Sequence, residues 1–122
     1  MKTMNQAQKI SAMLEEIAHP ARLAILLLIG NGEACVCHLE ALLGKRQAYI
    51  SQHLMALRDA GILLTRREGK FIFYRLRDPM LLKLIELAAK MENVDISDVP
   101  ASTACTCPNC SPQHERLAYS PG

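Results

Sequence analysis

The chain has few aromatic residues and no long apolar run. Two Phe, three Tyr and no Trp among 122 residues argue against a carbohydrate site or an aromatic cage. The longest unbroken apolar run, Leu23 to Ile29, has seven residues, far short of the roughly 20 that a membrane-spanning helix needs. The N-terminal residues, Met1 to Gln6, show no apolar core of the signal-peptide type. We therefore expect a soluble cytoplasmic protein.

The sequence also lacks the common patterns of catalytic sites. It contains no paired carboxylates, no glycine-rich phosphate loop and no Ser/His/Asp arrangement, so we do not expect an enzyme. Half of the residues are hydrophobic and 21% are charged, which excludes wholesale disorder and suits one domain with an apolar core. We place that domain at residues 1–92. Residues 93–122 are rich in Ser, Pro and Cys, lack periodicity, and are predicted to form a tail.

Positive charge is concentrated in the middle of the chain. The net charge is +2, but Lys45 to Arg77 contains eight basic and two acidic residues, so this segment alone carries +6. A basic segment between mildly acidic ends is typical of a surface that binds a polyanion such as DNA. A basic face that is merely solvated is the alternative on charge alone.

Apolar spacing predicts a mainly α-helical fold with a β-hairpin. Helical periodicity covers residues 5–18, 21–29, 33–43, 47–59 and 79–91. The first segment has one apolar stripe that we expect to be buried, and 21–29 is apolar almost all round, as a central core helix would be. Residues 63–67 and 70–76 alternate like strands around Glu68-Gly69. Helices 33–43 and 47–59 have helix-turn-helix size, and the hairpin after them predicts a winged helix-turn-helix.

The last predicted helix has little polar surface. Lys83, Glu86 and Lys90 form a narrow polar stripe, and apolar residues cover the rest. Such a helix needs two apolar partners. We expect one to be its own core and the other to be the same helix of a second copy, in a homodimer. Complete burial in a single core is the alternative.

The second helix of the predicted pair carries side chains suited to reading base edges. In this geometry its N-terminal part enters the major groove, while the wing reaches phosphates or the minor groove. Arg pairs with guanine and Gln with adenine by bidentate hydrogen bonds. A basic winged helix used for protein contact is the alternative. The predicted DNA-binding residues are Arg46, Gln47, Tyr49, Ser51, Gln52, His53, Arg66, Arg67 and Lys70.

Five cysteines fall in two groups, Cys35/Cys37 and Cys105/Cys107/Cys110. In a reducing compartment, clustered cysteines more often bind metal or sense oxidation than form structural disulfides. We expect Cys35 and Cys37 in the first turn of helix 33–43, where the positive helix end favours the thiolate. Residues two apart are about 200° apart around a helix axis, so both sulfurs would grip one ion only if that turn frayed. Such fraying would be a switch beside the DNA-reading helix, although one cysteine could simply be a core residue.

The tail cysteines could supply further sulfur ligands. Cys107 and Cys110 have the two-residue gap that lets a turn chelate one ion. All three could complete the site begun by Cys35 and Cys37, from the same or a second subunit, form a separate site, or serve redox chemistry. His38 is a possible fourth ligand, with a surface histidine as the alternative. All-sulfur ligation favours arsenite, antimonite, cadmium or lead over nickel or cobalt.

These motifs together resemble the ArsR/SmtB family of metal-responsive repressors. Glu33 to Leu39 looks like its metal-binding box, Ile50–Leu54 with Leu57–Gly61 resembles its recognition helix, and Arg67–Lys70 with Tyr74–Leu76 resembles its wing. The resemblance covers roughly Met4 to Met91 and implies a homodimeric winged-helix repressor that an inducer releases from its operator. Lys45-Arg46 stands where the family often has a Ser or Thr cap, and Glu40 where some arsenical repressors carry a third cysteine. The family's His- and carboxylate-based zinc site on the dimer helix looks absent here.

Three hypotheses follow. The first is a transcriptional repressor released by a thiophilic ion, As(III)/Sb(III) or Cd(II)/Pb(II), bound through the five cysteines. The second keeps the fold and the DNA binding but makes oxidation or persulfide formation the signal. The third is a thiol oxidoreductase that uses Cys107 and Cys110, which lacks the surrounding βαβ pattern.

Overall fold

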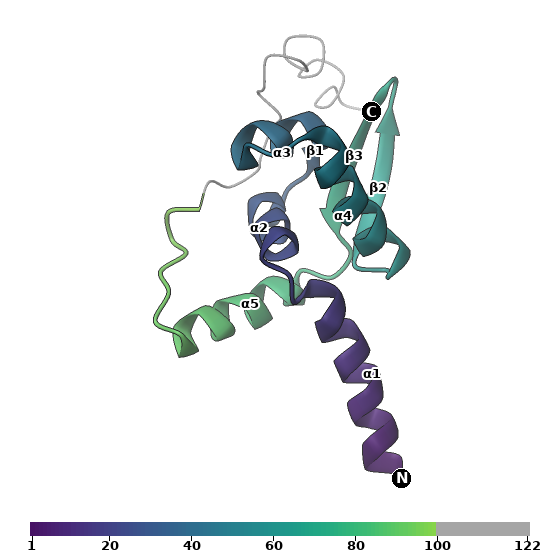
Figure 1. Ribbon diagram of the computed structural model, residues 1–122, viewed down its shortest axis with the longest axis vertical. Helices are drawn as coiled ribbons and strands as arrows, with labels where there is room; N and C mark the ends of the chain where they lie inside the picture. The colour runs from purple at the N-terminus through teal and green to yellow at the C-terminus, as the bar shows by residue number, and fades with distance from the viewer. Residues whose placement is uncertain (100–122) are drawn as a thin grey trace.

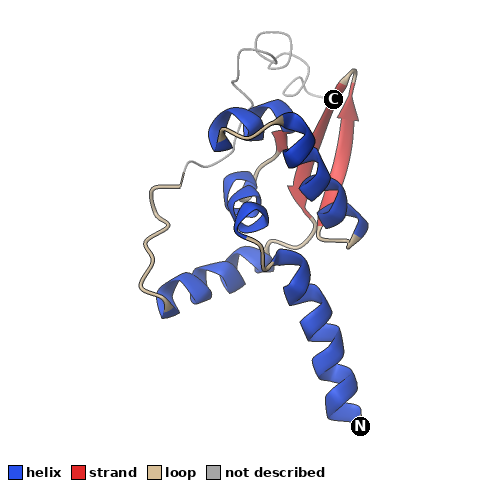
Figure 2. Cartoon of the chain, viewed as in Figure 1, coloured by secondary structure: helices blue, strands red, loops and turns tan. Residues whose placement is uncertain are grey.

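A computed structural model describes residues 1–99 (Figures 1 and 2). No helix in that range is long and apolar enough to cross a bilayer. The order of elements confirms the predicted winged helix-turn-helix. The elements are α1 (Lys2–Ile17), α2 (Pro20–Ile29), β1 (Ala34–Cys35), α3 (Val36–Leu43), α4 (Gln47–Asp59), β2 (Leu63–Glu68), β3 (Phe71–Leu76) and α5 (Met80–Met91).

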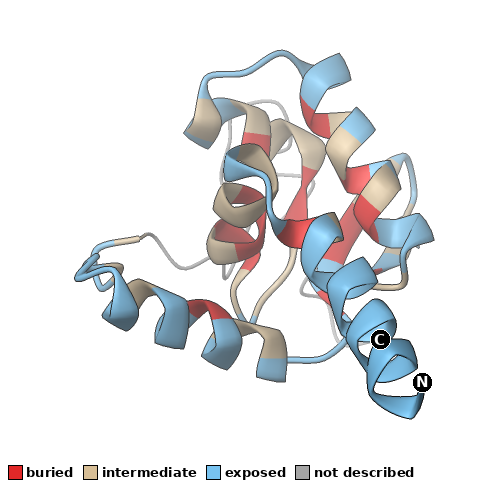
Figure 3. Ribbon diagram, turned by 60° about the horizontal axis from the view of Figure 1, so that its bottom comes forward, coloured by how far each residue is buried: buried red, intermediate tan, exposed pale blue. Residues whose placement is uncertain are grey.

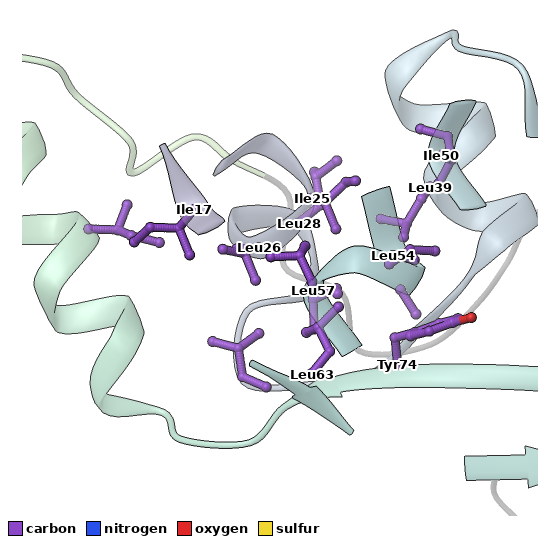
Figure 4. Packing of buried hydrophobic residues seen from close by; sticks show 14 residues of the cluster. Ile17, Ile25, Leu26, Leu28, Leu39, Ile50, Leu54, Leu57, Leu63 and Tyr74 are labelled. Atoms are coloured by element: carbon purple, nitrogen blue, oxygen red, sulfur yellow. The ribbon is translucent and has the colours of Figure 1, made fainter. Parts of the chain in front are cut away.

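Helix α2 lies at the centre of the core, as its apolar sequence predicts. Pro20 occupies its first turn, where a missing N–H costs nothing. Ile25, Leu26 and Ile29 are fully buried, and they pack with residues of α3, α4 and the sheet (Figure 4). Burial of each such side chain contributes about 1.5–3 kcal/mol. The core therefore fixes α3 and α4 against a common support.

The turn between α3 and α4 depends on one glycine. Gly44 has φ 65° and ψ 28°, the left-handed conformation in which glycine commonly ends a helix. Its N–H donates to the Glu40 carbonyl at 2.9 Å, and α4 begins three residues later. On α4, Ile50, Leu54 and Leu57 are fully buried. Their spacing turns the intervening residues of α4 away from the core.

The sheet has three antiparallel strands in the order β1-β3-β2. The predicted helix over 33–43 is wrong at its start, because Ala34 and Cys35 are extended and pair with Tyr74 and Phe73. Successive side chains of a strand face opposite sides. Consequently Ala34 and Tyr74 join the main core, while Cys35 and Phe73 form a separate buried cluster on the other face.

Helices α1 and α5 extend away from the core and expose apolar residues (Figures 1 and 3). The expectation that the α1 stripe is buried is wrong for most of it. Ile17 is buried, but Ile10, Met13 and Leu14 are 57%, 38% and 40% exposed. Helix α5 buries Ile85 alone and leaves Leu87 59% exposed. Leu81 and Leu82 of α5 are half-buried against the core beside Ile85, and both helices leave further apolar side chains exposed to solvent.

Candidate nucleic-acid interface and sulfur pair

The N-terminal half of α4 presents most of the predicted base-reading residues. Arg46 is the N-cap of α4 in an extended conformation and makes no side-chain capping bond. Arg46, Gln47, Tyr49 and Gln52 are exposed, and Ser51 is half-buried. Apart from Gln47, these side chains line a shallow surface groove together with Met55. The arrangement leaves one cation and two amides available to a duplex.

The hairpin turn adds two further cations. Arg67 and Lys70 flank Gly69 and are exposed. The Lys70 ammonium lies 5.7 Å from the centre of the Phe71 ring, and Arg67 donates a long 3.5 Å hydrogen bond to the Gly69 carbonyl. These contacts hold the cations loosely at the tip of the wing.

His53 faces α2 as well as solvent. Its Nδ1 accepts a 3.1 Å hydrogen bond from Arg22 Nε, and its ring meets the Tyr49 ring edge-on at 4.8 Å. Burial lowers the pKa of His53 below its usual value, and the charges of Arg22 and His19 lower it further. Arg22 also donates to the Glu16 carbonyl at 2.9 Å. His53 therefore joins α4 to α2 and the end of α1.

Arg66 makes a set of contacts within the protein. Its Nε and Nη2 donate to the two oxygens of Glu33 at 3.1 and 2.8 Å, and its Nη1 donates to Glu68 at 2.6 Å. Its guanidinium lies 4.5 Å from the centre of the Phe73 ring. The hydrogen bond to Glu33 contributes most to raising the pKa of Arg66. Two carboxylates thus already surround a residue expected to contact DNA.

Cys35 and Cys37 come together without fraying of α3. The predicted 200° separation assumed that both lie in the helix, which is wrong. Cys35 is the N-cap, with φ −96° and ψ 167°, and Cys37 lies in the first turn. The two Sγ atoms are 3.0 Å apart, which is longer than the roughly 2.05 Å of a disulfide bond. The extended residue before the helix is what brings the sulfurs together.

The sulfur pair opens into the same groove as the start of α4. This groove has a volume of about 550 Å³ and lies between α3, α4 and β3. Cys35 and Cys37 line one side, Gln47 and Ser51 another, and Lys70 the wing side. A change at the sulfurs therefore occurs next to residues that face the candidate DNA surface.

Two sulfurs are an incomplete ligand set for a thiophilic ion. In a tetrahedral zinc site, bonds of about 2.3 Å place two sulfurs roughly 3.8 Å apart, so this pair would have to open by less than about 1 Å to hold that ion. Within residues 1–99, no group of three or more His, Cys, Asp and Glu side chains could hold a metal. His38 therefore does not complete the set. Cys105, Cys107 and Cys110 lie outside the described residues.

Comparison with known proteins identifies the family. Residues 19–64 match the model described as bacterial regulatory protein, arsR family. The chain is 37% identical over 99 residues to the arsenical resistance operon repressor of Escherichia coli, covering 78% of this chain and 83% of that protein. The chain belongs to the ArsR family.

Other members of the ArsR family are also similar to it. The biofilm growth-associated repressor of Agrobacterium fabrum is 47% identical over 81 residues, covering 66% of this chain and 69% of that protein. The crystal structure of the repressor BigR from Xylella fastidiosa superposes with a TM-score of 0.67 at 33% identity, covering 74% of this chain and 92% of that one. The ArsR-family protein is therefore a helix-turn-helix transcriptional repressor and not an enzyme.

Sequence reasoning missed three participants in these contacts. Arg22 contacts His53, while Glu33 and Phe73 both contact Arg66. Arg22–His53 and Glu33–Arg66 are separated by 31 and 33 positions, so no local pattern indicates them. The alternation of Arg66 and Glu68 on one strand is the single signal in the sequence that an intramolecular ion pair could form on that face.

Proposed function

We propose that this ArsR-family repressor acts in the cytoplasm as a homodimer and leaves its operator when Cys35 and Cys37 bind a thiophilic metal(loid) ion. The observation that carries this proposal is the shared groove, in which both sulfurs lie beside Gln47 and Ser51 of α4. The E. coli relative, named as an arsenical resistance repressor, supports arsenite or antimonite. Cadmium and lead fit the same sulfur chemistry.

The DNA surface is proposed from exposure and charge. Arg46, Gln47, Tyr49 and Gln52, with Ser51 at the groove edge, would enter the major groove, and Arg67 and Lys70 would meet phosphates. Each neutralised phosphate releases counterions, so affinity should fall steeply with salt. In this assignment His53 and Arg66 serve first in the intramolecular contacts described above.

The second copy is proposed to cover α1 and α5. Met13 of α1 and Met80, Leu81 and Leu84 of α5 line an apolar groove of about 420 Å³ beside Gly61. Exposed apolar residues continue from it along both helices, and water contact with so large a patch is unfavourable. A twofold dimer buries this surface and presents two copies of α4 to adjacent turns of DNA. The residues concerned are Met4, Ile10, Met13, Leu14, Met80, Leu84, Leu87 and Met91.

Release follows from the geometry of ligation. Ligation of one ion by both sulfurs changes their 3.0 Å separation and so moves β1 relative to the first turn of α3. Because α3 packs on α4, the shift changes the wall of the groove that α4 shares. A coupling of about 1–3 kcal/mol is typical of such linked sites. We propose that one or more of Cys105, Cys107 and Cys110 supplies the remaining ligands.

The test combines DNA binding with metal titration. An operator fragment is selected from a random-sequence library with the wild-type protein. Arsenite or cadmium should raise its Kd about 5- to 150-fold, and metal–sulfur absorption in the ultraviolet should appear in parallel. Cys35→Ser should abolish the release.

Two controls separate the roles of the cysteine groups. A chain truncated after Val99 and a triple Ser variant at Cys105, Cys107 and Cys110 should bind DNA as the wild type does but respond to ions more weakly. Unchanged DNA affinity of the wild type with soft ions present or chelated away would contradict the inducer assignment. Full induction of Cys35→Ser would contradict the site.

The 3.0 Å contact between the sulfurs favours oxidation as a second candidate signal. Two cysteine thiols and one hydrogen peroxide would give a disulfide and two waters, with peroxide accepting the two electrons and both protons. The disulfide would join Cys35 to Cys37, whose sulfurs the extended backbone of Cys35 already brings close together, or would join one of them to another cysteine. Mass spectrometry after peroxide treatment distinguishes the signals, because a crosslink with DNA release and no ion supports oxidation.

A further inference from the structure

Three residues form one row across the sheet. Cys35 of β1 is paired with Phe73 of β3, and Phe73 is paired with Arg66 of β2. Directly opposed residues place their side chains on the same face of a sheet. Cys35 and Phe73 are 3% and 2% exposed and share a cluster with Cys37 and Phe71 that is separate from the main core. The sulfur pair therefore lies against an aromatic ring that Arg66 covers.

Arg66 also contacts two carboxylates, one in the segment that precedes β1 and one at the end of its own strand, β2. Its two-point contact is with Glu33, two residues before Cys35, and its third hydrogen bond is with Glu68, the last residue of β2. The hairpin turn and its exposed cations, Arg67 and Lys70, lie at this end of the strand. The Arg66 guanidinium thus contacts Glu33 in the segment that leads to the sulfur pair, the Phe73 ring, and Glu68 at the start of the hairpin turn.

The same contacts make Arg66 a poor ligand for phosphate. Its positive charge faces two carboxylates at hydrogen-bond distance, and three of its five N–H groups already donate to them, so it attracts a phosphate less strongly than an unpaired arginine would. Arg67 provides the contrast, because it is the next residue, points to the opposite face of the strand, and is exposed. Of these two adjacent arginines, Arg66 is thus engaged with carboxylates of the protein and Arg67 is exposed to solvent.

We propose that Arg66 is a positioning residue that connects the Cys35–Cys37 pair to the wing, and is not a DNA-contacting residue. Displacement of Cys35 moves Glu33 along the same short segment and moves Phe73 through direct packing. Both contacts act on Arg66, which passes the change to Glu68 and hence to the cations of the turn. The proposal rests on the proposed function in one respect, namely that the inducer acts at this sulfur pair.

The test uses the full-length protein and separates the effect of the positive charge at position 66 from the effect of the specific contacts that Arg66 makes. Arg66→Lys keeps the positive charge but loses the two-point contact and the planar stacking. Glu33→Gln leaves every wing cation in place and removes the charged partner. For both variants we expect a wild-type slope of log Kd against log salt for the selected operator. We also expect the ratio of Kd values with and without arsenite to fall at least five-fold toward one.

Arg67→Gln is the matched control. It should lower the salt slope by about 0.9 for each phosphate that is no longer neutralised and leave the arsenite ratio unchanged. The proposal is overturned if Arg66→Gln lowers the salt slope as much as Arg67→Gln does while the arsenite ratio stays at the wild-type value. It is equally overturned if folded Glu33→Gln, checked by thermal unfolding, keeps the full arsenite response.

A second measurement tests the role of Arg66 without an inducer. If neither arsenite nor cadmium releases the wild type from DNA, only the inducer assignment is rejected, and this measurement still tests Arg66. Coupling is reciprocal, so loosening Arg66 must loosen the cluster around Cys35. Reduced Arg66→Lys and Glu33→Gln proteins should react with iodoacetamide at Cys35 several-fold faster than wild type, as measured by mass spectrometry. Wild-type rates in both variants, with Arg67→Gln as reference, would show that Arg66 does not act on the sulfur pair.

Discussion

At the residue scale, His53 joins α4 to the helices that support it. Its Nδ1 accepts from Arg22 at 3.1 Å, which requires an unprotonated Nδ1 and leaves Nε2 to carry the ring hydrogen. Arg22 in turn contacts the Glu16 carbonyl and carboxylate. Helix α4 is thus tied to α1 and α2 by a hydrogen bond that protonation of His53 would break.

We predict that stability falls as the pH drops below about 6.5. The pKa of His53 in the folded protein is lowered from 6.5, chiefly by burial and then by Arg22 and His19. Between the folded and unfolded pKa values, only the unfolded chain takes up the proton. The stabilisation is therefore complete above the unfolded pKa and is lost as the pH falls toward the folded one.

Urea unfolding at about pH 7.5 and about pH 5.5, one on each side of the unfolded pKa, checks this sign at fixed protein concentration. His53→Asn supplies an amide oxygen that can accept from Arg22 and does not titrate. Its midpoint should move less between the two pH values than that of wild type. Some dependence should remain, because burial also lowers the pKa of His38. Identical shifts in the two proteins would exclude His53 as the titrating group.

At the element scale, the helix-turn-helix depends on the backbone at Gly44. Its φ of 65° lies in the left-handed region, and a Cβ built there meets nothing within 4 Å. The cost of a side chain is therefore conformational and not steric. Gly44 therefore favours the left-handed turn that ends α3 three residues before Gln47, while core packing also holds the two helices.

Gly44→Ala should lower the free energy of unfolding by about 1–2 kcal/mol. Gly44→Asn should cost less, because asparagine tolerates the left-handed conformation. Chemical denaturation of the wild type, Gly44→Asn and Gly44→Ala should give free energies of unfolding that decrease in that order. An alanine variant as stable as wild type would show that the turn adopts another conformation in solution.

The elements also show what sequence patterns can and cannot predict. Long periodic segments such as 21–29 and 47–59 predict their helices correctly, because burial of one face dictates their spacing. The pattern misses β1 because a two-residue strand has no period, and its pairing with β3 is formed over a long sequence separation. The approach of the two sulfurs depends on that strand and could not be found from helix geometry.

At the scale of the whole molecule, α1 and α5 both expose large apolar side chains within residues 1–99. The sequence pattern correctly indicates apolar faces on both, but it cannot distinguish a face that meets its own core from one that meets a partner. Ile17 anchors α1 and Ile85 anchors α5, with Leu81 and Leu82 half-buried beside Ile85, and exposed apolar side chains remain on both helices. That surface is the basis of the proposed dimer.

Leu87→Glu should convert the protein to a monomer without unfolding it. Leu87 is 59% exposed in the single chain, so the charge disturbs the proposed interface and spares the core. Loss of two-site binding should weaken operator affinity by about 100-fold or more. Sedimentation analysis and circular dichroism give the two readouts, with exposed Glu86→Gln as control. A Leu87→Glu protein that still sediments as a dimer would refute this interface.

The sulfur pair lies on the outer face of the sheet, the face that carries Cys35 and Phe73 and points away from the main core. This position has a consequence for how such proteins diversify. The residues that surround it form their own small cluster, while folding rests on the apolar residues of the opposite face. Under the proposed function, exchanges among the residues of this cluster can therefore alter which ion the repressor responds to while the main core stays unchanged. The same separation makes the outer face a practical starting point for engineering biosensors with new selectivity.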